Sequence, residues 1–145
     1  MKVVFLDIDG VLNHTDMFCV LNSCRNVDML DGEAVLLLNR FVESDVKFVL
    51  SSSWRCAFSV ESVEGDLKEK GFKGELIGAT PIMGDGHRGR EIETWLLLHP
   101  EVRDFVIFDD CSGMEPLMHR LVQTDVDVGL TEDHVVLAMK LLGVG

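Results

Sequence analysis

The feature that most constrains this chain is a short apolar run near its start that ends in two carboxylates and a glycine. Residues 3–6 read Val-Val-Phe-Leu, and Asp7, Asp9 and Gly10 follow. A short apolar run bounded by glycine predicts a buried strand. Carboxylates this close repel one another and are costly to desolvate, so they add no stability by themselves. A cation, most simply a metal ion, is therefore expected to offset their charge.

Length and composition indicate one globular domain over residues 1–145. The chain has 145 residues, of which 47% are hydrophobic, which is enough for a core of its own. No apolar run reaches the length that crosses a bilayer, so we expect no membrane partner. Acidic residues interrupt the first apolar run after a few positions, so we expect no secretory signal and a cytoplasmic location.

The net charge of −12 limits the classes of partner. It repels anionic membranes and disfavours extended contacts along a nucleic-acid backbone. It leaves room for a local basic pocket that holds a single phosphate. The sequence leaves the oligomeric state open.

The four cysteines do not form a metal signature. Cys19, Cys24, Cys56 and Cys111 match no zinc spacing, and no Cys-x-x-Cys occurs. In a reducing compartment they are expected to remain free thiols that pack as small buried apolar side chains.

Apolar runs alternate with helical patterns along the chain. We expect strands at residues 3–6, 46–50, 75–77, 105–108 and 121–124, and helices at 31–43, 59–70, 90–98 and 131–142. Residues 81–89 contain three glycines and predict a loop, and residues 11–30 predict an irregular, flap-like insert. Alternating strands and helices predict an α/β fold with one doubly wound parallel sheet of about five strands.

Polar side chains follow three of the predicted strands. Asp7 and Asp9 end the first, Ser51 ends the second, and Asp109 with Asp110 ends the fourth. In an open parallel sheet the carboxyl ends of the strands meet at one crevice, where ligands bind. The sequence therefore predicts one site that contains all of these residues.

These motifs resemble the haloacid dehalogenase (HAD) superfamily, and in particular its phosphatases with an aspartate nucleophile. Asp7-Ile8-Asp9-Gly10 matches the first family motif, and the strand that ends in Ser51 matches the second. A basic residue near a helix start matches the third, and the acidic pair 109–110 matches the fourth. Each motif alone is weak, but four in order across nearly the whole chain are specific.

The resemblance implies a reaction and a role for each residue. Asp7 attacks the phosphorus of a phosphomonoester and forms an aspartyl-phosphate. Asp9 protonates the leaving alkoxide and later deprotonates the hydrolytic water. Ser51 and the basic residue hold the phosphoryl oxygens. The implied cofactor is Mg²⁺, with ligands drawn from Asp7, the backbone carbonyl of Asp9, Asp109 and Asp110.

For the basic position the sequence favours Arg88, in the glycine-rich loop before the helix, with Arg90 two residues later as the alternative. The family usually carries lysine there, but arginine binds phosphate well as a planar fork. Ser52 and Arg55 follow Ser51 closely and are further candidates for substrate binding. Trp54, between them, either forms a wall for a base or sugar or packs a helix start.

The spacing of the motifs leaves no room for a large cap domain. The segments 51–55, 78–81, 88–92 and 129–131 further resemble the small HAD domains associated with RNA-repair proteins. That resemblance implies a phosphorylated substrate that is a nucleotide or a nucleic-acid end. Two alternatives stay open, a nucleotidase for free mononucleotides and a phosphate-binding or interaction module with little turnover. Asp9 favours the enzymes, because mere phosphate binding does not need it.

Overall fold

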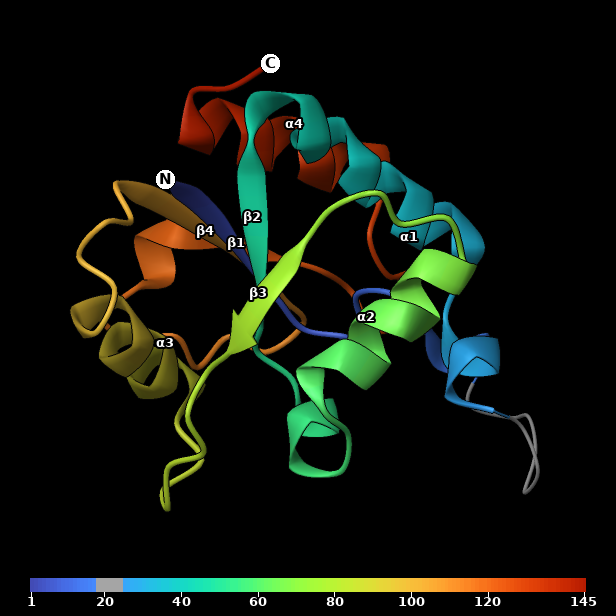
Figure 1. Cartoon of the computed structure of the whole chain (residues 1–145), viewed down its shortest axis with the longest axis horizontal. Helices are drawn as coiled ribbons and strands as arrows, with labels where there is room; N and C mark the ends of the chain where they lie inside the picture. Colours follow the sequence, from blue (N-terminus) through green and yellow to red (C-terminus); the bar gives the residue numbers. More distant parts are fainter. Residues whose placement is uncertain (18–24) are drawn as a thin grey trace.

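The structure is a computed structural model that describes residues 1–17 and 25–145. Its centre is one five-stranded sheet in the order β3-β2-β1-β4-β5, and every strand pair in it is parallel. Figure 1 shows the twisted sheet with β1 at its middle. The strands are β1 (Lys2–Leu6), β2 (Val46–Leu50), β3 (Leu76–Ala79), β4 (Asp104–Asp109) and β5 (Leu121–Gln123). The predicted α/β class with a parallel sheet is confirmed.

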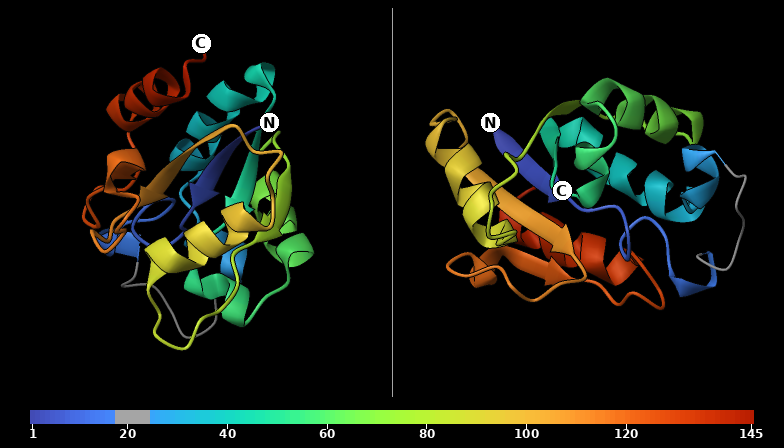
Figure 2. Two further views of the ribbon diagram at one scale, coloured as in Figure 1. Left: turned by 90° about the vertical axis from the view of Figure 1, so that its left-hand side faces the viewer. Right: turned by 90° about the horizontal axis from the view of Figure 1, so that it is seen from below.

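Helices cover both faces of the sheet (Figure 2). They are α1 (Gly32–Leu37), α2 (Val60–Glu69), α3 (Arg88–Leu97) and α4 (Glu132–Leu142). Buried residues of α3 pack on one face, and those of α1, α2 and α4 pack on the other. This three-layer arrangement buries both faces of every central strand, which explains why the strands read as continuous apolar runs.

Strand β1 shows how side chains divide between the two cores. Val4 and Leu6 belong to the larger cluster beneath α1, α2 and α4, whereas Val3 and Phe5 belong to the smaller cluster beneath α3. Successive side chains of a strand point to opposite faces, so four apolar residues in a row serve both layers. All four are fully buried.

Element ends differ from the sequence prediction at several places. α3 begins at Arg88 rather than at residue 90, because His87 is its N-cap and accepts a hydrogen bond from the Arg90 N–H. The predicted helix 31–43 is divided into α1 and a 3₁₀ segment, Leu38–Ser44. Within this segment the Asn39 side chain donates to the Gly71 carbonyl and accepts from the Lys73 N–H.

The predicted flap-like insert at 11–30 is described only in part, since residues 18–24 lie outside the described residues. The described parts contain two short 3₁₀ turns, Thr15–Met17 and Asn26–Met29. Within the described ranges the chain carries no folded cap domain, as the motif spacing predicted. No helix among these residues is long and apolar enough to cross a membrane.

The cysteine prediction is corrected. Cys56 and Cys111 are exposed free thiols rather than buried apolar side chains. Each belongs to a connecting segment beyond a strand end, where few apolar neighbours exist to bury it. Cys19 and Cys24 lie outside the described residues.

Candidate active site

Three of the predicted site residues lie side by side at the carboxyl end of the sheet. Leu6 at the end of β1 pairs in register with Leu50 of β2 and Phe108 of β4. The next residues are Asp7, Ser51 and Asp109. Their backbones continue the ladder for one more step, because the Asp7 N–H donates to Phe108 and the Ser51 N–H donates to Leu6 at 3.0 and 2.8 Å. Parallel pairing in register therefore brings together residues that are far apart in the sequence.

Arg88 stands between two of the carboxylates. Its Nη1 lies 2.9 Å from Asp7 Oδ2 and 2.7 Å from Asp109 Oδ2, and it also donates to the Ser51 carbonyl at 3.3 Å. Gly89 makes this placement possible. A Cβ at Gly89 would lie 2.5 Å from the Glu115 carbonyl oxygen, so only glycine lets the start of α3 approach so closely.

Three carboxylates meet in a group that suits a hard divalent cation. One oxygen from each of Asp7, Asp109 and Asp110 lies within 4.8 Å of the others. Asp7 and Asp109 are buried, and Asp110 is half-buried. Oxygen ligands of this type are those that Mg²⁺ prefers, with water completing its octahedral shell. Residues that fit a metal are therefore present, and Arg88 supplies one positive charge against three carboxylates.

The pKa shifts at this site show that its carboxylates crowd negative charge into a buried place. Burial raises the pKa of Asp7 well above its ordinary range, the negative charge of Asp109 raises it further, and Arg88 opposes both. Burial and Asp109 also raise the pKa of Asp110. Burial alone would lower the pKa of the Arg88 guanidinium, but the charges and hydrogen bonds of Asp7 and Asp109 raise it above its ordinary value. The group therefore gains from any further positive charge.

Ser51, whose backbone carbonyl accepts a hydrogen bond from Arg88, carries a buried hydroxyl. The residue is 1% exposed, and its Oγ has no hydrogen-bond partner among the described residues. A buried hydroxyl without a partner is costly and needs an explanation. A bound phosphoryl oxygen would accept its hydrogen bond, which agrees with the predicted role of Ser51.

Asp9 is near the three-carboxylate group but is not one of its members. Its Oδ1 accepts hydrogen bonds from Asn13 Nδ2 at 2.9 Å and from Trp54 Nε1 at 3.2 Å. The side chain is therefore held apart from Asp7. The resemblance assigned only the Asp9 backbone carbonyl to the metal, and this side-chain position is compatible with that assignment.

Three further candidates for substrate binding remain predictions, and each already has a partner within the protein. Ser52 is fully buried, and its Oγ accepts a hydrogen bond from the Trp54 N–H as the N-cap of the 3₁₀ turn Ser53–Cys56. The Arg55 side chain is 8% exposed and pairs with Glu91 at 2.8 Å. Arg90 forms a surface ion pair with Asp85 and is 63% exposed.

The Arg55 guanidinium forms most of its possible hydrogen bonds with the protein itself. It donates to the carbonyls of Ser52, Thr80 and Pro81 as well as to the Glu91 carboxylate. Four of its five N–H donors are therefore used. Arg55 therefore joins three chain segments, and its predicted contact with a substrate remains a prediction.

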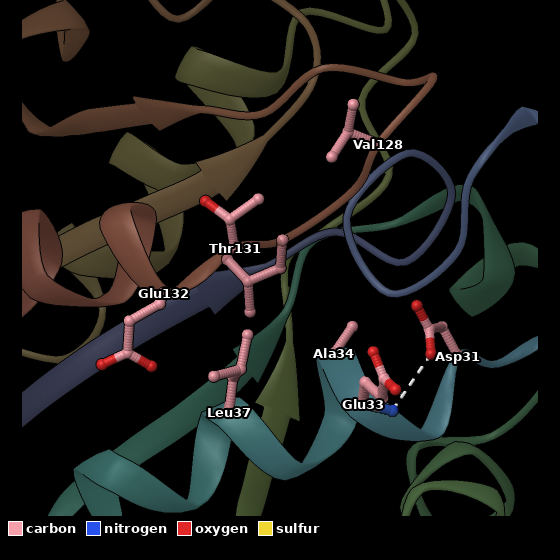
Figure 3. A pocket seen from close by; sticks show the side chains of 8 residues that line it. Asp31, Glu33, Ala34, Leu37, Val128, Thr131 and Glu132 are labelled. Atoms are coloured by element: carbon pink, nitrogen blue, oxygen red, sulfur yellow. Dashed lines mark hydrogen bonds between the residues drawn. The ribbon is translucent and has the colours of Figure 1, made fainter.

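A cavity of about 390 Å³ opens between α1 and the start of α4 (Figure 3). None of the predicted site residues lines it. Its acidic rim has local partners, since Asp31 caps α1 by accepting the Glu33 N–H and Glu132 pairs with Arg40. These contacts explain the acidic side chains without a ligand.

The sequence analysis missed three contacts that shape the site. Asn13 and Trp54 hold Asp9, and Glu91 holds Arg55. A signal existed for Asn13, because asparagine four residues after Asp9 is a typical turn-closing residue. The contacts of Trp54 and Glu91 depend on side-chain direction, which no local pattern reports.

A family model for the HAD domain in Swiss Army Knife RNA repair proteins matches residues 3–135. The match covers most of the chain, including every predicted site residue, so the protein belongs to this HAD family. The predicted resemblance is therefore confirmed at the level of family and fold. Searches of the curated proteins and of the solved structures returned no match.

Proposed function

We propose that this protein is a Mg²⁺-dependent phosphomonoester hydrolase that uses Asp7 as its nucleophile. One observation carries the proposal: Arg88 holds Asp7 within a three-carboxylate group, and Ser51 at the neighbouring strand end has a buried hydroxyl without a partner among the described residues. This arrangement offers a nucleophile, a guanidinium, a hydroxyl donor and a site for a hard cation. Phosphoryl transfer needs these groups, because it depends on positioning and on stabilising charge.

Each residue then has one task. An oxygen of Asp7 forms a bond to phosphorus while the bond from phosphorus to the leaving oxygen breaks, which yields an aspartyl-phosphate. Asp9 gives its proton to the leaving oxygen. Asp9 next takes a proton from the water that attacks phosphorus, and the bond to Asp7 breaks to release inorganic phosphate. Arg88 and Ser51 bind the non-bridging oxygens.

Asp7, Asp109, Asp110 and the carbonyl of Asp9 would hold the metal. A bound Mg²⁺ neutralises negative charge and orients the phosphoryl group. The charge balance supports this assignment, since among the described residues Arg88 is the one basic side chain that pairs with the three-carboxylate group, through Asp7 and Asp109.

We further propose that the substrate is a nucleotide or a nucleic-acid end. The family name refers to RNA repair. The described residues contain no folded cap over the site, which suits a bulky substrate. The net charge of −12 disfavours long contacts along a nucleic-acid backbone, so the contact is expected at the terminal phosphate.

The first test is release of phosphate from p-nitrophenyl phosphate with and without Mg²⁺. We expect Mg²⁺-dependent release that Asp7→Asn abolishes while the fold persists. Asp104→Asn is the matched control, because Asp104 begins the same strand that Asp109 ends and pairs with Arg120 there. Release by Asp7→Asn at the wild-type rate would contradict the assigned nucleophile.

A second set of assays separates the substrate classes. Free mononucleotides and oligonucleotides with a 3′- or 5′-phosphate are compared by kcat/KM. A preference for oligonucleotide ends supports end processing, and a preference for mononucleotides indicates a nucleotidase. Phosphate binding without release from any of them would indicate a binding module instead.

A further inference from the structure

The Asp9 carboxylate is held on one side only. Asn13 Nδ2 and Trp54 Nε1 both donate to Oδ1, at 2.9 and 3.2 Å. Among the described residues, no group forms a hydrogen bond with Oδ2. Asn13 and Trp54 both donate hydrogen bonds to Oδ1, so Oδ1 already accepts two bonds. Oδ2 is therefore the oxygen that can exchange a proton.

The turn that contains Asp9 does not need this carboxylate. Asn13 closes the turn, because its Oδ1 accepts the Gly10 N–H at 2.8 Å. That bond also fixes the orientation of the Asn13 amide, so its Nδ2 faces Asp9. Within the described residues the Asp9 carboxylate accepts no backbone N–H. Holding Asp9 in place therefore serves something other than local chain folding.

Trp54 is fixed by both of its neighbours near the end of β2. On one side the Ser52 hydroxyl oxygen accepts a hydrogen bond from the Trp54 backbone N–H at 3.2 Å. On the other side Arg55 binds the carbonyls of Ser52 and Thr80 and the carboxylate of Glu91. The indole also packs against the larger core. The ring therefore has little freedom to turn away from Asp9.

We propose that Asn13 and Trp54 are positioning residues for proton transfer by Asp9, and that Ser52 and Arg55 hold Trp54 in place. This inference rests on the proposed phosphatase activity. It gives a role to Asn13 and Trp54, neither of which is assigned a contact with the substrate. Removing one of the two donors frees the carboxylate to rotate away from the leaving oxygen.

The effect depends on the leaving group, because an acid catalyst matters most when the leaving oxygen is strongly basic. Phenyl phosphate and p-nitrophenyl phosphate have the same ring but differ in this property. Their kcat/KM values report steps up to the first irreversible one, which includes attack by Asp7. A misplaced Asp9 therefore lowers kcat/KM more for phenyl phosphate than for p-nitrophenyl phosphate.

The experiment uses Trp54→Phe, which keeps an aromatic ring and removes the N–H donor. We expect kcat/KM for phenyl phosphate to fall about tenfold, the effect of one hydrogen bond to a charged group, with a much smaller loss for p-nitrophenyl phosphate. Asn13→Asp is the second variant. It keeps an acceptor for the Gly10 N–H but replaces the donor to Asp9 by a carboxylate oxygen, so the same selective loss is expected.

Trp95→Phe is the matched control. Trp95 lies in the smaller core on the other face of the sheet, stacked on His99 with ring centroids 3.6 Å apart. It has no contact with Asp9, so the ratio of kcat/KM for the two esters should equal that of the wild type. The unfolding transition of each variant confirms that it is folded.

The outcomes separate this inference from the proposed function. A selective loss for phenyl phosphate in folded Trp54→Phe and Asn13→Asp supports positioning. Equal losses for both esters, or no loss, overturn it while leaving the phosphatase in place. Absence of Mg²⁺-dependent release by the wild type on either ester overturns the proposed function, and this inference with it.

Discussion

At the scale of single residues, Gly10 lies where the first motif approaches the fourth. Its φ is +83°, in the left-handed region that favours glycine. A Cβ at this position would lie 2.4 Å from Asp110 Oδ2. The glycine of the first motif is therefore required both by the backbone turn and by the neighbouring carboxylate.

We predict that Gly10→Ala lowers the free energy of unfolding by at least about 1–2 kcal/mol, the cost of a side chain in the left-handed region. It should also weaken Mg²⁺ binding, because Asp110 must move. Chemical denaturation and calorimetric titration measure the two effects. Gly65→Ala is the control, since Gly65 lies in α2 with open space around it. There the substitution should stabilise the protein by about 1 kcal/mol.

A second residue-scale prediction concerns His134 in the first turn of α4. Its Nδ1 accepts the Thr131 N–H at 3.0 Å, which only a neutral imidazole can do. Burial lowers the pKa of His134, although Asp133 opposes the shift. The unfolded chain therefore binds this proton more readily than the folded one. The contribution of His134 to stability is complete above about pH 6.5, the ordinary imidazole value, and is lost as the pH falls toward the folded value.

His134→Gln should remove this pH dependence, because glutamine completes a capping box with Thr131 without titrating. The difference in unfolding free energy between pH 7.5 and pH 5.5 should shrink by an amount below about 1 kcal/mol, the typical value of a cap. If the unfolding free energy changed equally between pH 7.5 and pH 5.5 in wild type and His134→Gln, the assigned cap would be wrong.

At the scale of elements, the first turn of α3 contacts both the carboxylates of the site and the segment that contains Trp54 and Arg55. Its first residue, Arg88, pairs with Asp7 and Asp109, and Glu91 one turn later pairs with Arg55. Residues three apart lie on the same face of a helix. One helical turn therefore holds both Asp7 and the segment that carries Trp54.

We predict that Glu91→Ala destabilises the protein by about 3–5 kcal/mol, because it leaves the buried Arg55 charge without its partner. The Glu91 carboxylate also accepts the Met83 N–H at 3.0 Å, and that donor would be left unpaired as well. Denaturant unfolding measures the loss. Glu93→Ala on the same helix is the control, since Glu93 is exposed and its loss should change stability by less than about 0.5 kcal/mol. A similar effect for both variants would contradict the structural role of the Arg55–Glu91 pair.

At the scale of the whole molecule, the net charge of −12 and the buried carboxylate group make stability depend on cations. A ligand that binds only the folded state raises the free energy of unfolding by about 2.7 kcal/mol at a hundred times its Kd. Mg²⁺ at that concentration is therefore expected to raise the Tm by several degrees, and a chelator should reverse the change.

Asp110→Asn tests whether this stabilisation comes from the three-carboxylate group. The variant should lose most of the Mg²⁺-dependent rise in Tm. Asp104→Asn, at the opposite end of β4, should keep it. A rise in Tm that both variants retain would place the stabilising cation elsewhere on this acidic surface.

The sequence by itself determined the elements and the meeting of the strand ends. Short apolar runs between helical patterns specify a parallel sheet, and parallel strands present their carboxyl ends at one edge. Asp7, Ser51 and Asp109 follow directly from this rule, because Leu6, Leu50 and Phe108 pair in register. These predictions needed only the position of each residue along its own strand.

The tertiary structure alone decided which side chains face one another. The sequence favoured Arg88 but kept Arg90 as an alternative, because a helix turns by about 100° per residue and its exact start determines which of them reaches Asp7. The start at Arg88 brings that residue to the carboxylates and leaves Arg90 with Asp85. Trp54 and Arg55 likewise took their roles from distant partners, Asp9 and Glu91. Such contacts depend on packing between separate elements, a property that no local stretch of sequence contains.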